Sequence, residues 1–345
     1  SLLYLVPVGI AAWRVGRGAG MALSFASAAS WIAAYLWARG FRFDPRLLFW
    51  NATVEQGVYL TVALTLSTVR CEMDKQRALA AELRNAYAQL DDELRQVGDI
   101  QLRMLPTAPP PMPGWRIVMH YSPSRRSGGD YYDFFPLGDG RVGFVIADAS
   151  GHGTPAAVVM AMIRVLLHTD PEALGAPEQV LHSANLRLSR TILTGQFVTA
   201  CYSVFECRDG RLEYSMAGHP PPLVIRVKSG AAEEFSNPTG PPLGLFDSSV
   251  YTRQCVRLEP GDAVLFYTDG LTEAQGRDGE LFGVDRVKQI LSEGRRVTEC
   301  ELQDRLLGAL RAHTGAASLP DDLTFVLARW VAPGPSATRS CSDPT

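Results

Sequence analysis

Residues 143–153 read Gly-Phe-Val-Ile-Ala-Asp-Ala-Ser-Gly-His-Gly, and this stretch decides the fold. Its first five residues form an apolar run with the length and composition of a buried β-strand. The run ends at Asp148, and the glycine-containing segment 150–153 follows. A carboxylate at the end of a buried strand either caps a neighbouring element or belongs to a polar site at the edge of the sheet.

Acidic residues next to apolar runs or to glycines recur elsewhere in the chain. The other acidic residues are Asp130, after a double glycine, Asp269, after residues 264–268, and the pair Asp321 and Asp322, before residues 323–327. A lone strand-end Asp is more often a turn or cap residue, so Asp148 could cap the following helix and Asp133 could lie in a turn. Four such motifs in one domain are less easily explained in that way.

Carboxylates that converge on one pocket repel one another unless cations offset their charge. A set of oxygen ligands without cysteine or paired histidine favours Mg²⁺ or Mn²⁺ over zinc. Two such ions can lower the pKa of a bridging water and hold a phosphoryl group for in-line attack. The pattern therefore indicates a metal-dependent hydrolase of phosphate esters.

Short β-type runs fill the chain from Gly114 onward, and helical segments interrupt them in blocks. The expected strands are 115–121, 141–147, 197–205, 212–216, 223–227, 263–267 and 323–330, and the expected helices are 154–168, 177–192, 284–291 and 300–312. Asp139-Gly140 and Asp209-Gly210 are hairpin signals, which favour antiparallel pairing. Blocks of strands with inserted helices predict an α+β layered domain.

A helical connector precedes this region. Residues 72–104 contain no proline and many good helix formers. An apolar stripe at near-heptad spacing runs along them: Leu79, Leu83, Ala86, Leu90, Leu94 and Val97. The stripe favours a short parallel coiled coil that pairs two chains, although a single amphipathic helix lying on its own domain is the alternative. The prolines from Pro106 to Pro113 end the helix.

The first 70 residues have the composition of a membrane region. They hold eight charged residues with a net charge of +4, whereas the other 275 hold 61 with a net of −7. Residues 21–38 and 47–69 are each long enough to cross a hydrocarbon layer of about 30 Å. Residues 2–13 are too short alone and would be the end of a truncated span, and a cleavable signal peptide is the competing interpretation. Glu55 inside the second span is either a sensing or helix-contact residue or an interfacial one.

Composition excludes two further classes of protein. A pI near 6.1 gives no basic face for nucleic acid. The six cysteines are scattered without a CxxC pair, which fits reduced thiols in a cytosolic compartment rather than a disulfide framework.

Five blocks carry a resemblance to a known family. They are Gly128-Gly129-Asp130-Tyr131-Tyr132-Asp133-Phe134-Phe135, Asp148-Ala149-Ser150-Gly151-His152-Gly153, Ala217-Gly218-His219-Pro220-Pro221, Tyr267-Thr268-Asp269-Gly270-Leu271-Thr272-Glu273 and Asp321-Asp322-Leu323-Thr324. In this order they resemble the SpoIIE-type branch of the metal-dependent protein phosphatases (PPM, type 2C), over about residues 99–330. The resemblance implies two antiparallel sheets flanked by helices and two Mn²⁺ or Mg²⁺ ions between the sheets. It also implies hydrolysis of phosphoserine or phosphothreonine in a partner, often an anti-sigma factor antagonist of the STAS type.

The resemblance also implies roles for individual residues. Asp148 would bridge both metals, and the Ala149 carbonyl would reach one of them. The remaining ligands would be Asp130, Asp269 and Asp321, with Asp322 more a support than a ligand. Metal-bound hydroxide would attack phosphorus, without a covalent enzyme intermediate.

Three other residues are candidates for weaker reasons. His152 could protonate the leaving seryl oxygen, or hold a loop. Arg125 could bind substrate phosphate in a bidentate way, or be a solvated surface residue. His219, followed by two prolines, is more a structural residue than a catalytic one. Arg126 and Ser127 depart from the acidic and apolar residues usual before the double glycine, which affects substrate fit rather than metal binding.

The expected organisation is therefore a transmembrane region (1–70), a connector (71–105), a phosphatase domain (106–331) and a disordered tail (332–345). The expected protein is a multi-pass, membrane-anchored phosphatase that faces the cytoplasm, forms a homodimer through its connector, contacts membrane lipid and binds no nucleic acid. Two alternatives stay open: a phosphatase-fold scaffold that binds a partner without turnover, and a dinuclear-metal hydrolase of small phosphate esters.

Overall fold

The structure is a computed structural model that describes residues 2–38, 44–169, 173–235, 240–315 and 319–332. The chain divides into two compact units, residues 1–91 and 92–345, which we describe separately. The disorder predicted for the tail falls on residues 333–345, outside the described part of the chain.

The first unit contains helices that approach closely through small residues. They are η1 (Leu2–Tyr4), α1 (Leu5–Arg14), α2 (Arg17–Ala38) and the first part of α3 (Pro45–Met104). A Cβ added at Gly20 would lie 2.7 Å from the Ala12 Cβ and 3.2 Å from the Ala63 Cβ, so glycine permits this contact. Gln56 Nε2 donates a hydrogen bond to Ser24 Oγ at 2.7 Å, which gives this polar group a partner on another helix.

One helix in the described part of the chain, α2, is long and apolar enough to cross a membrane by length and composition alone. The other expected span, residues 47–69, is helical but lies within the longer α3 and does not reach the same apolar content. Its polar residues Asn51, Glu55 and Gln56 are the physical reason. A multi-pass arrangement is therefore not supported.

The predicted connector is helical from residue 71 to Met104. It forms the second half of α3, which ends at Met104, two residues before Pro106. Three leucines of the apolar stripe, Leu79, Leu83 and Leu90, are more than half exposed in the single chain.

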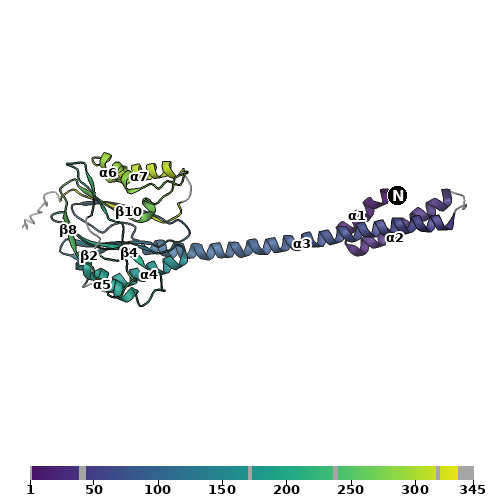
Figure 1. The fold of residues 1–345 in the computed structure, drawn as a ribbon, viewed down its shortest axis with the longest axis horizontal. Coiled ribbons are helices and arrows are strands. Elements are labelled where there is room, and N and C mark those ends of the chain that lie inside the picture. Colours follow the sequence, from purple (N-terminus) through teal and green to yellow (C-terminus); the bar gives the residue numbers. More distant parts are fainter. Residues whose placement is uncertain (1, 39–43, 170–172, 236–239, 316–318, 333–345) are drawn as a thin grey trace, which may run out of the picture. The chain divides into compact units, whose positions relative to one another are not determined.

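The second unit contains two five-stranded antiparallel sheets (Figure 1). Sheet A has the order β1-β10-β9-β6-β7, and sheet B has the order β2-β3-β4-β5-β8. The strands are β1 (Trp115–Ser122), β2 (Asp130–Gly138), β3 (Arg141–Ala149), β4 (Val198–Glu206), β5 (Arg211–Ala217), β6 (Leu223–Ile225), β7 (Ala232–Glu234), β8 (Gln254–Arg257), β9 (Ala263–Tyr267) and β10 (Leu323–Trp330). The turn between β2 and β3 has positive φ at Asp139 (52°) and Gly140 (77°), as the Asp-Gly hairpin signal predicts.

Helices cover the outer face of each sheet. They are α4 (Thr154–His168) and α5 (Pro177–Leu188) on sheet B, and α6 (Val284–Glu293) and α7 (Glu299–Thr314) on sheet A. Short 3₁₀ turns, η2 (Ala173–Gly175) and η3 (Asp269–Leu271), complete the described elements. The α-β-β-α layers confirm the predicted α+β phosphatase sandwich (Figure 1).

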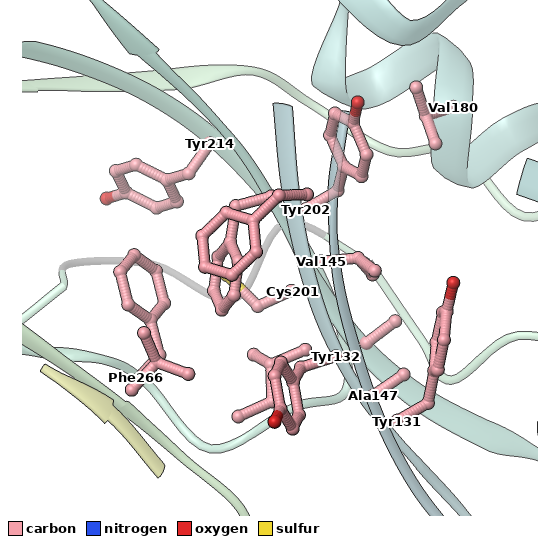
Figure 2. Close-up of a cluster of buried hydrophobic side chains, with 14 of the residues drawn as sticks. Tyr131, Tyr132, Val145, Ala147, Val180, Cys201, Tyr202, Tyr214 and Phe266 are labelled. Carbon is pink, nitrogen blue, oxygen red and sulfur yellow. The ribbon is translucent and has the colours of Figure 1, made fainter. Parts of the chain in front are cut away.

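Aromatic side chains fill the space between the sheets. Phe144 of sheet B and Phe266 of sheet A meet edge to face, with ring centroids 4.9 Å apart. Figure 2 shows Phe266 on one side of the strands of sheet B, and Tyr131 with Val180 of α5 on the other. Both faces of sheet B are thus buried, which explains why β3 is an almost continuous apolar run.

The structure corrects two alternatives for acidic residues. Asp148 does not cap α4, because Gly153 is its N-cap residue and Asp148 lies inside β3. Asp133 does not lie in a turn, because it is a buried residue of β2. The sequence analysis also missed β2, β7 and β8 as strands.

Candidate active site

The register of β2 and β3 brings two of the predicted carboxylates together. Asp130, the first residue of β2, pairs directly with Asp148, near the end of β3. Asp130 is 1% exposed, so its carboxylate is removed from solvent. Two acidic side chains at paired positions of neighbouring strands form the centre of the candidate site.

Two threonines of sheet A bind the Asp130 carboxylate. Thr268 Oγ1 donates to Asp130 Oδ2 at 2.8 Å, and Thr324 Oγ1 donates to the same oxygen at 2.5 Å. Thr268 follows β9 and Thr324 lies in β10, so these bonds join sheet A to the first strand of sheet B. The sequence analysis did not identify either threonine, although each lies within two residues of an acidic candidate.

Burial first, and repulsion between the acids second, raise the pKa values of the carboxyl groups in the site. Burial raises the pKa of Asp148 to about 9, and the charges of four other acids add to the effect: Asp130, Asp269, Asp321 and Asp322. Burial also raises the pKa of Asp130, and burial followed by the charge of Asp321 raises the pKa of Asp269 to about 6. Carboxylates from β2, β3, η3 and the segment before β10 therefore share one electrostatic environment.

Backbone atoms approach the carboxylates at the double glycine. A Cβ added at Gly129 would lie 2.7 Å from the Ala149 carbonyl oxygen and 3.2 Å from Asp148 Oδ1. Glycine is therefore required at this position, and the Ala149 carbonyl lies beside the acidic cluster.

The residues fit hard divalent cations in chemistry and charge. The cluster offers carboxylate and carbonyl oxygens, and every charge that raises the pKa of Asp148 is that of another acid. Within the described part of the chain, no group of three or more His, Cys, Asp or Glu side chains is arranged so that it could hold a metal ion. One Asp130 oxygen accepts two threonine hydroxyls, so a bound cation would use the other oxygen or rearrange these side chains.

Asp322 holds the loop that precedes the double glycine. Its Oδ1 accepts hydrogen bonds from Ser124 N at 2.7 Å and Ser124 Oγ at 3.0 Å, and its Oδ2 accepts one from Gly129 N at 2.6 Å. Both ends of the segment 124–129 are thus fixed to the residue before β10. These bonds occupy both carboxylate oxygens of Asp322.

Gln101, near the end of α3, binds the same loop and was also missed. Its Nε2 donates to the Gly128 carbonyl at 2.5 Å, and its Oε1 accepts from Gly128 N at 3.0 Å. Gln101 is 4% exposed. A single glutamine in a helical sequence gives no signal of such a role.

The weaker candidates lie in two places. Arg125 and His152 are exposed and line one cavity of about 670 Å³. His219 is buried in the segment that crosses from β5 to β6, and its Nδ1 lies 3.0 Å from Thr199 Oγ1. Burial lowers the pKa of His219 to about 3, so its imidazole is neutral.

Two antiparallel sheets between helical layers, with an acidic cluster where they meet, are the fold of the PP2C-type phosphatase domain, and the family and the relatives below show that class for this chain. The family described as Stage II sporulation protein E (SpoIIE) matches residues 138–331, more than half of the chain, and the chain belongs to this family.

Two relatives are similar to most of this chain. Phosphoserine phosphatase RsbU of Bacillus subtilis is 26% identical over 247 residues, which cover 72% of each protein. Protein IcfG of Synechocystis is 26% identical over 275 residues, which cover 72% of this chain and 43% of IcfG. The chain therefore spans less than half the length of IcfG.

Two solved structures have the same fold. The SiaA-PP2C domain of Pseudomonas aeruginosa aligns with a TM-score of 0.62 and 23% identity, over 71% of this chain and 98% of that domain. The RsbU and RsbW domains of Rv1364c from Mycobacterium tuberculosis align with a TM-score of 0.57 and 30% identity, over 67% of this chain and 64% of that one.

Proposed function

We propose that this protein is a Mn²⁺- or Mg²⁺-dependent phosphatase that removes phosphate from phosphoserine or phosphothreonine on a signalling protein, of the STAS type. The observation that carries the proposal is the convergence of acidic residues from both sheets around Asp148. The similarity to RsbU, named a phosphoserine phosphatase, supports the same reaction.

The chain's own residues would have the following roles. Asp130, Asp148, Asp269, Asp321 and the Ala149 carbonyl would hold two cations. When bound, these ions offset the acidic charge, activate water and stabilise the charge on the phosphoryl group. The protein contributes fixed geometry, because the hydroxyls of two threonines orient the Asp130 carboxylate.

Two cavity residues would act on the substrate. Arg125 would bind the phosphate oxygens, since a guanidinium can donate two parallel hydrogen bonds. His152, four residues after Asp148, would donate a proton to the leaving seryl or threonyl oxygen, since an imidazole N–H can act as a general acid. Both side chains are exposed in the same cavity, which is open to a protein substrate.

A comparison of substrates tests this function against its nearest rival. The full chain with Mn²⁺ would be assayed on a phosphoserine protein and on p-nitrophenyl phosphate, and we expect the higher kcat/KM on the phosphoprotein. A preference for the free ester would favour the hydrolase of small esters. Partner binding without turnover on either substrate would favour the scaffold.

We further propose that α2 anchors the protein in the cytoplasmic membrane with the phosphatase unit in the cytoplasm, and that α3 pairs two chains. The length and apolar composition of α2 and the exposed leucines Leu79, Leu83 and Leu90 support this. The expected result is that the full chain sediments with membranes and that Leu83→Cys forms a disulfide-linked dimer. A protein that remains in the supernatant, or a Cys variant that stays monomeric under oxidation, would contradict the respective part.

A further inference from the structure

A cavity of about 580 Å³ lies in the helical first unit. Its walls are the turn between α1 and α2, the start of α2 and one face of α3. Arg17 lines it from α2, and Arg70, Cys71, Asp74 and Lys75 line it from α3. The cavity is therefore built where two helices of this unit meet.

The cavity lies at the end of α2 from which α3 continues toward the second unit. The two helices run in opposite directions, because Ser24 binds Gln56 whereas Gly20, earlier in α2, approaches Ala63, later in α3. Arg17 precedes Gly20, so the start of α2 lies beside the residues of α3 that follow Ala63. Because α2 is the proposed anchor and the second unit is proposed to be cytoplasmic, the cavity belongs at the level of the cytoplasmic lipid head groups.

A tryptophan beside the cavity supports this level. The Trp13 carbonyl accepts a hydrogen bond from Arg70 Nη1, which joins α1 to α3. The Trp13 side chain is exposed. Tryptophan is enriched at membrane interfaces, where its ring lies among the head groups. Trp13 and the cations of the cavity therefore have the composition of an interfacial region.

The cavity is positively charged. Arg17, Arg70 and Lys75 line it, and Asp74 is the one acidic residue among its described lining residues. Asp74 is shared, because its carboxylate lies 3.5 Å from Arg70 Nε and 3.6 Å from Arg77 Nη1. Arg17 and Lys75 have no ion-pair or side-chain hydrogen-bond partner among the described residues. Two cations are thus available to an anion.

The start of α2 adds backbone donors to these cations. The first N–H groups of a helix have no acceptor within the helix, and the helix dipole gives this end a partial positive charge. A Cβ added at Gly16 or Gly18 would meet no described atom within 4 Å, so the space beside this backbone is open. An anion in the cavity can therefore approach the N-terminus of a 22-residue helix.

The leucine stripe that is proposed to pair two chains leaves the cavity open. The stripe begins at Leu79, after Ala78, the last residue of α3 that lines the cavity. At about 100° per residue, the lining face of α3 is centred about 130° around the helix from the stripe. A partner chain on the stripe would therefore not fill the cavity.

We propose that this cavity binds the phosphate group of an anionic ligand, with Arg17 and Lys75 as its cationic contacts and the start of α2 as a source of N–H donors. Ala12, Val15 and Ala78 line the same cavity and would contact the organic part of the ligand. The ligand class is an organic phosphate, which is either the head group of an anionic phospholipid or a soluble phosphate ester. The inference rests on the proposed anchoring by α2 and not on phosphatase activity.

Cys71 provides a probe inside the cavity, since its thiol is free and exposed. The full chain is incorporated into phosphatidylcholine nanodiscs with increasing phosphatidylglycerol, in EDTA. Alkylation by N-ethylmaleimide is then followed at each cysteine by peptide mass spectrometry. We expect phosphatidylglycerol to slow the alkylation of Cys71 and to leave the exposed cysteines of the second unit, Cys255 and Cys300, unchanged.

A second arm distinguishes the two sources of phosphate. Soluble glycerol 3-phosphate is added to discs of phosphatidylcholine alone, and EDTA prevents its metal-dependent hydrolysis. Protection of Cys71 by phosphatidylglycerol alone would support the site and identify a lipid head group as its ligand. Protection by glycerol 3-phosphate would support the site and identify a soluble ester.

Two cavity variants and one control separate a defined site from the general charge of the surface. In Arg17→Gln and in Lys75→Gln, the amount of ligand that halves the Cys71 rate should rise about fivefold, the contribution of one cation near an anionic surface. Arg14→Gln removes an exposed cation at the same end of the unit that does not line the cavity, and it should leave this amount unchanged.

Several results would overturn the inference. Equal effects of Arg14→Gln and Arg17→Gln would show a diffuse attraction rather than a site. Equal slowing of Cys71 and Cys255, no slowing by either ligand, or a Cys71 that is unreactive in every lipid would reject the site as well. A chain that stays outside the discs would reject the anchoring by α2, and the soluble ester would then decide the site alone. None of these results depends on phosphate release, so they leave the proposed phosphatase to its own test.

Discussion

At the scale of single residues, the ionised form of Asp148 is electrostatically unfavourable in the metal-free protein. Its pKa rises to about 9 because it is buried and faces four other acids. A metal-dependent phosphatase can tolerate such repulsion, because the same carboxylates attract the cations and the bound cations offset the negative charge. The same arrangement makes the metal-free protein less stable than its packing alone would allow.

Asp148→Asn should therefore separate activity from stability. We expect phosphate release to fall by about 100-fold or more, in the range found when one electrostatic contact of a reaction centre is lost. In EDTA the variant should melt no lower than the wild type, since a neutral amide replaces a carboxylate in the acidic cluster. Saturating Mn²⁺, at about 100 times its Kd, should stabilise the wild type by about 2.7 kcal/mol and leave the variant unchanged. A variant that is stabilised by Mn²⁺ as strongly as the wild type would contradict the ligand assignment.

His219 predicts a pH dependence with a defined sign. Burial lowers its pKa to about 3, whereas an unfolded histidine titrates near pH 6.5. Between these values the unfolded chain binds one more proton, so unfolding becomes easier as the pH falls below about 6.5, by at most about 1.4 kcal/mol per pH unit. His219→Gln removes this titration. Urea unfolding at about pH 7.5 and pH 5 should show a loss about 2 kcal/mol smaller in the variant. Equal losses would show that His219 is accessible to protons in the native state.

The sequence predicts acidic residues more readily than the residues that hold them. Asp148 and Asp269 were identifiable because a carboxylate at the end of an apolar run contrasts with its neighbours, and Asp130 because it follows a double glycine. Thr268, Thr324 and Gln101 gave no such contrast. Their roles depend on contacts across 138, 194 and 27 residues of chain, which only the folded structure brings together.

At the scale of elements, one carboxylate joins β2, α4 and the end of α3. Asp133 Oδ2 accepts hydrogen bonds from Tyr131 Oη at 2.7 Å and Arg164 Nη1 at 2.9 Å, and lies 2.9 Å from His168 Nε2. Arg164 also donates to the carbonyl of Met104, the last residue of α3. Arg164 thus holds the end of the connector helix while it pairs with a buried acid.

Arg164→Met should destabilise the second unit by about 2–3 kcal/mol, because it removes the ion-pair partner of a buried carboxylate. The estimate lies below the range for fully buried pairs, since the Arg164 side chain is 31% exposed. The control is Lys288→Met, which breaks the more exposed pair with Glu234 and should cost less than about 1 kcal/mol. Urea unfolding followed by tryptophan fluorescence measures both. Equal losses in the two variants would contradict a special role for Arg164.

The elements that the sequence predicted are those with a simple pattern. β9 and β10 were predicted to the residue, because a strand buried on both sides forms a dense apolar run. α4 was also predicted to the residue, because it is dense in apolar residues, although Val158 and Val165 are exposed. β7 and β8 have three and four residues and are partly exposed, so their pairing partners rather than their composition make them strands. β2 begins directly after a double glycine. A glycine pair is typical of a loop, so only the pairing with β3 identifies this segment as a strand.

At the scale of the whole molecule, a helical first unit and a phosphatase-type second unit share one continuous helix, α3. The end of that helix contributes Gln101 to the loop before the acidic cluster and Leu94 to the adjoining cavity. A signal that shifts the connector would therefore reach both the loop before the acidic cluster and the adjoining cavity. Fusion of residues 92–345 to an unrelated constitutive dimer should change the rate of phosphate release, and an unchanged rate would count against such regulation.

The measurement that tests the central claim most directly is phosphate release by the full chain with Mn²⁺. The substrates are a panel of phosphoserine and phosphothreonine peptides and phosphorylated STAS proteins, and the controls are EDTA and Asp148→Asn. The account predicts turnover of at least one phosphoprotein, which both controls abolish. No turnover with Mn²⁺ or Mg²⁺ by a protein that is folded by circular dichroism would contradict it.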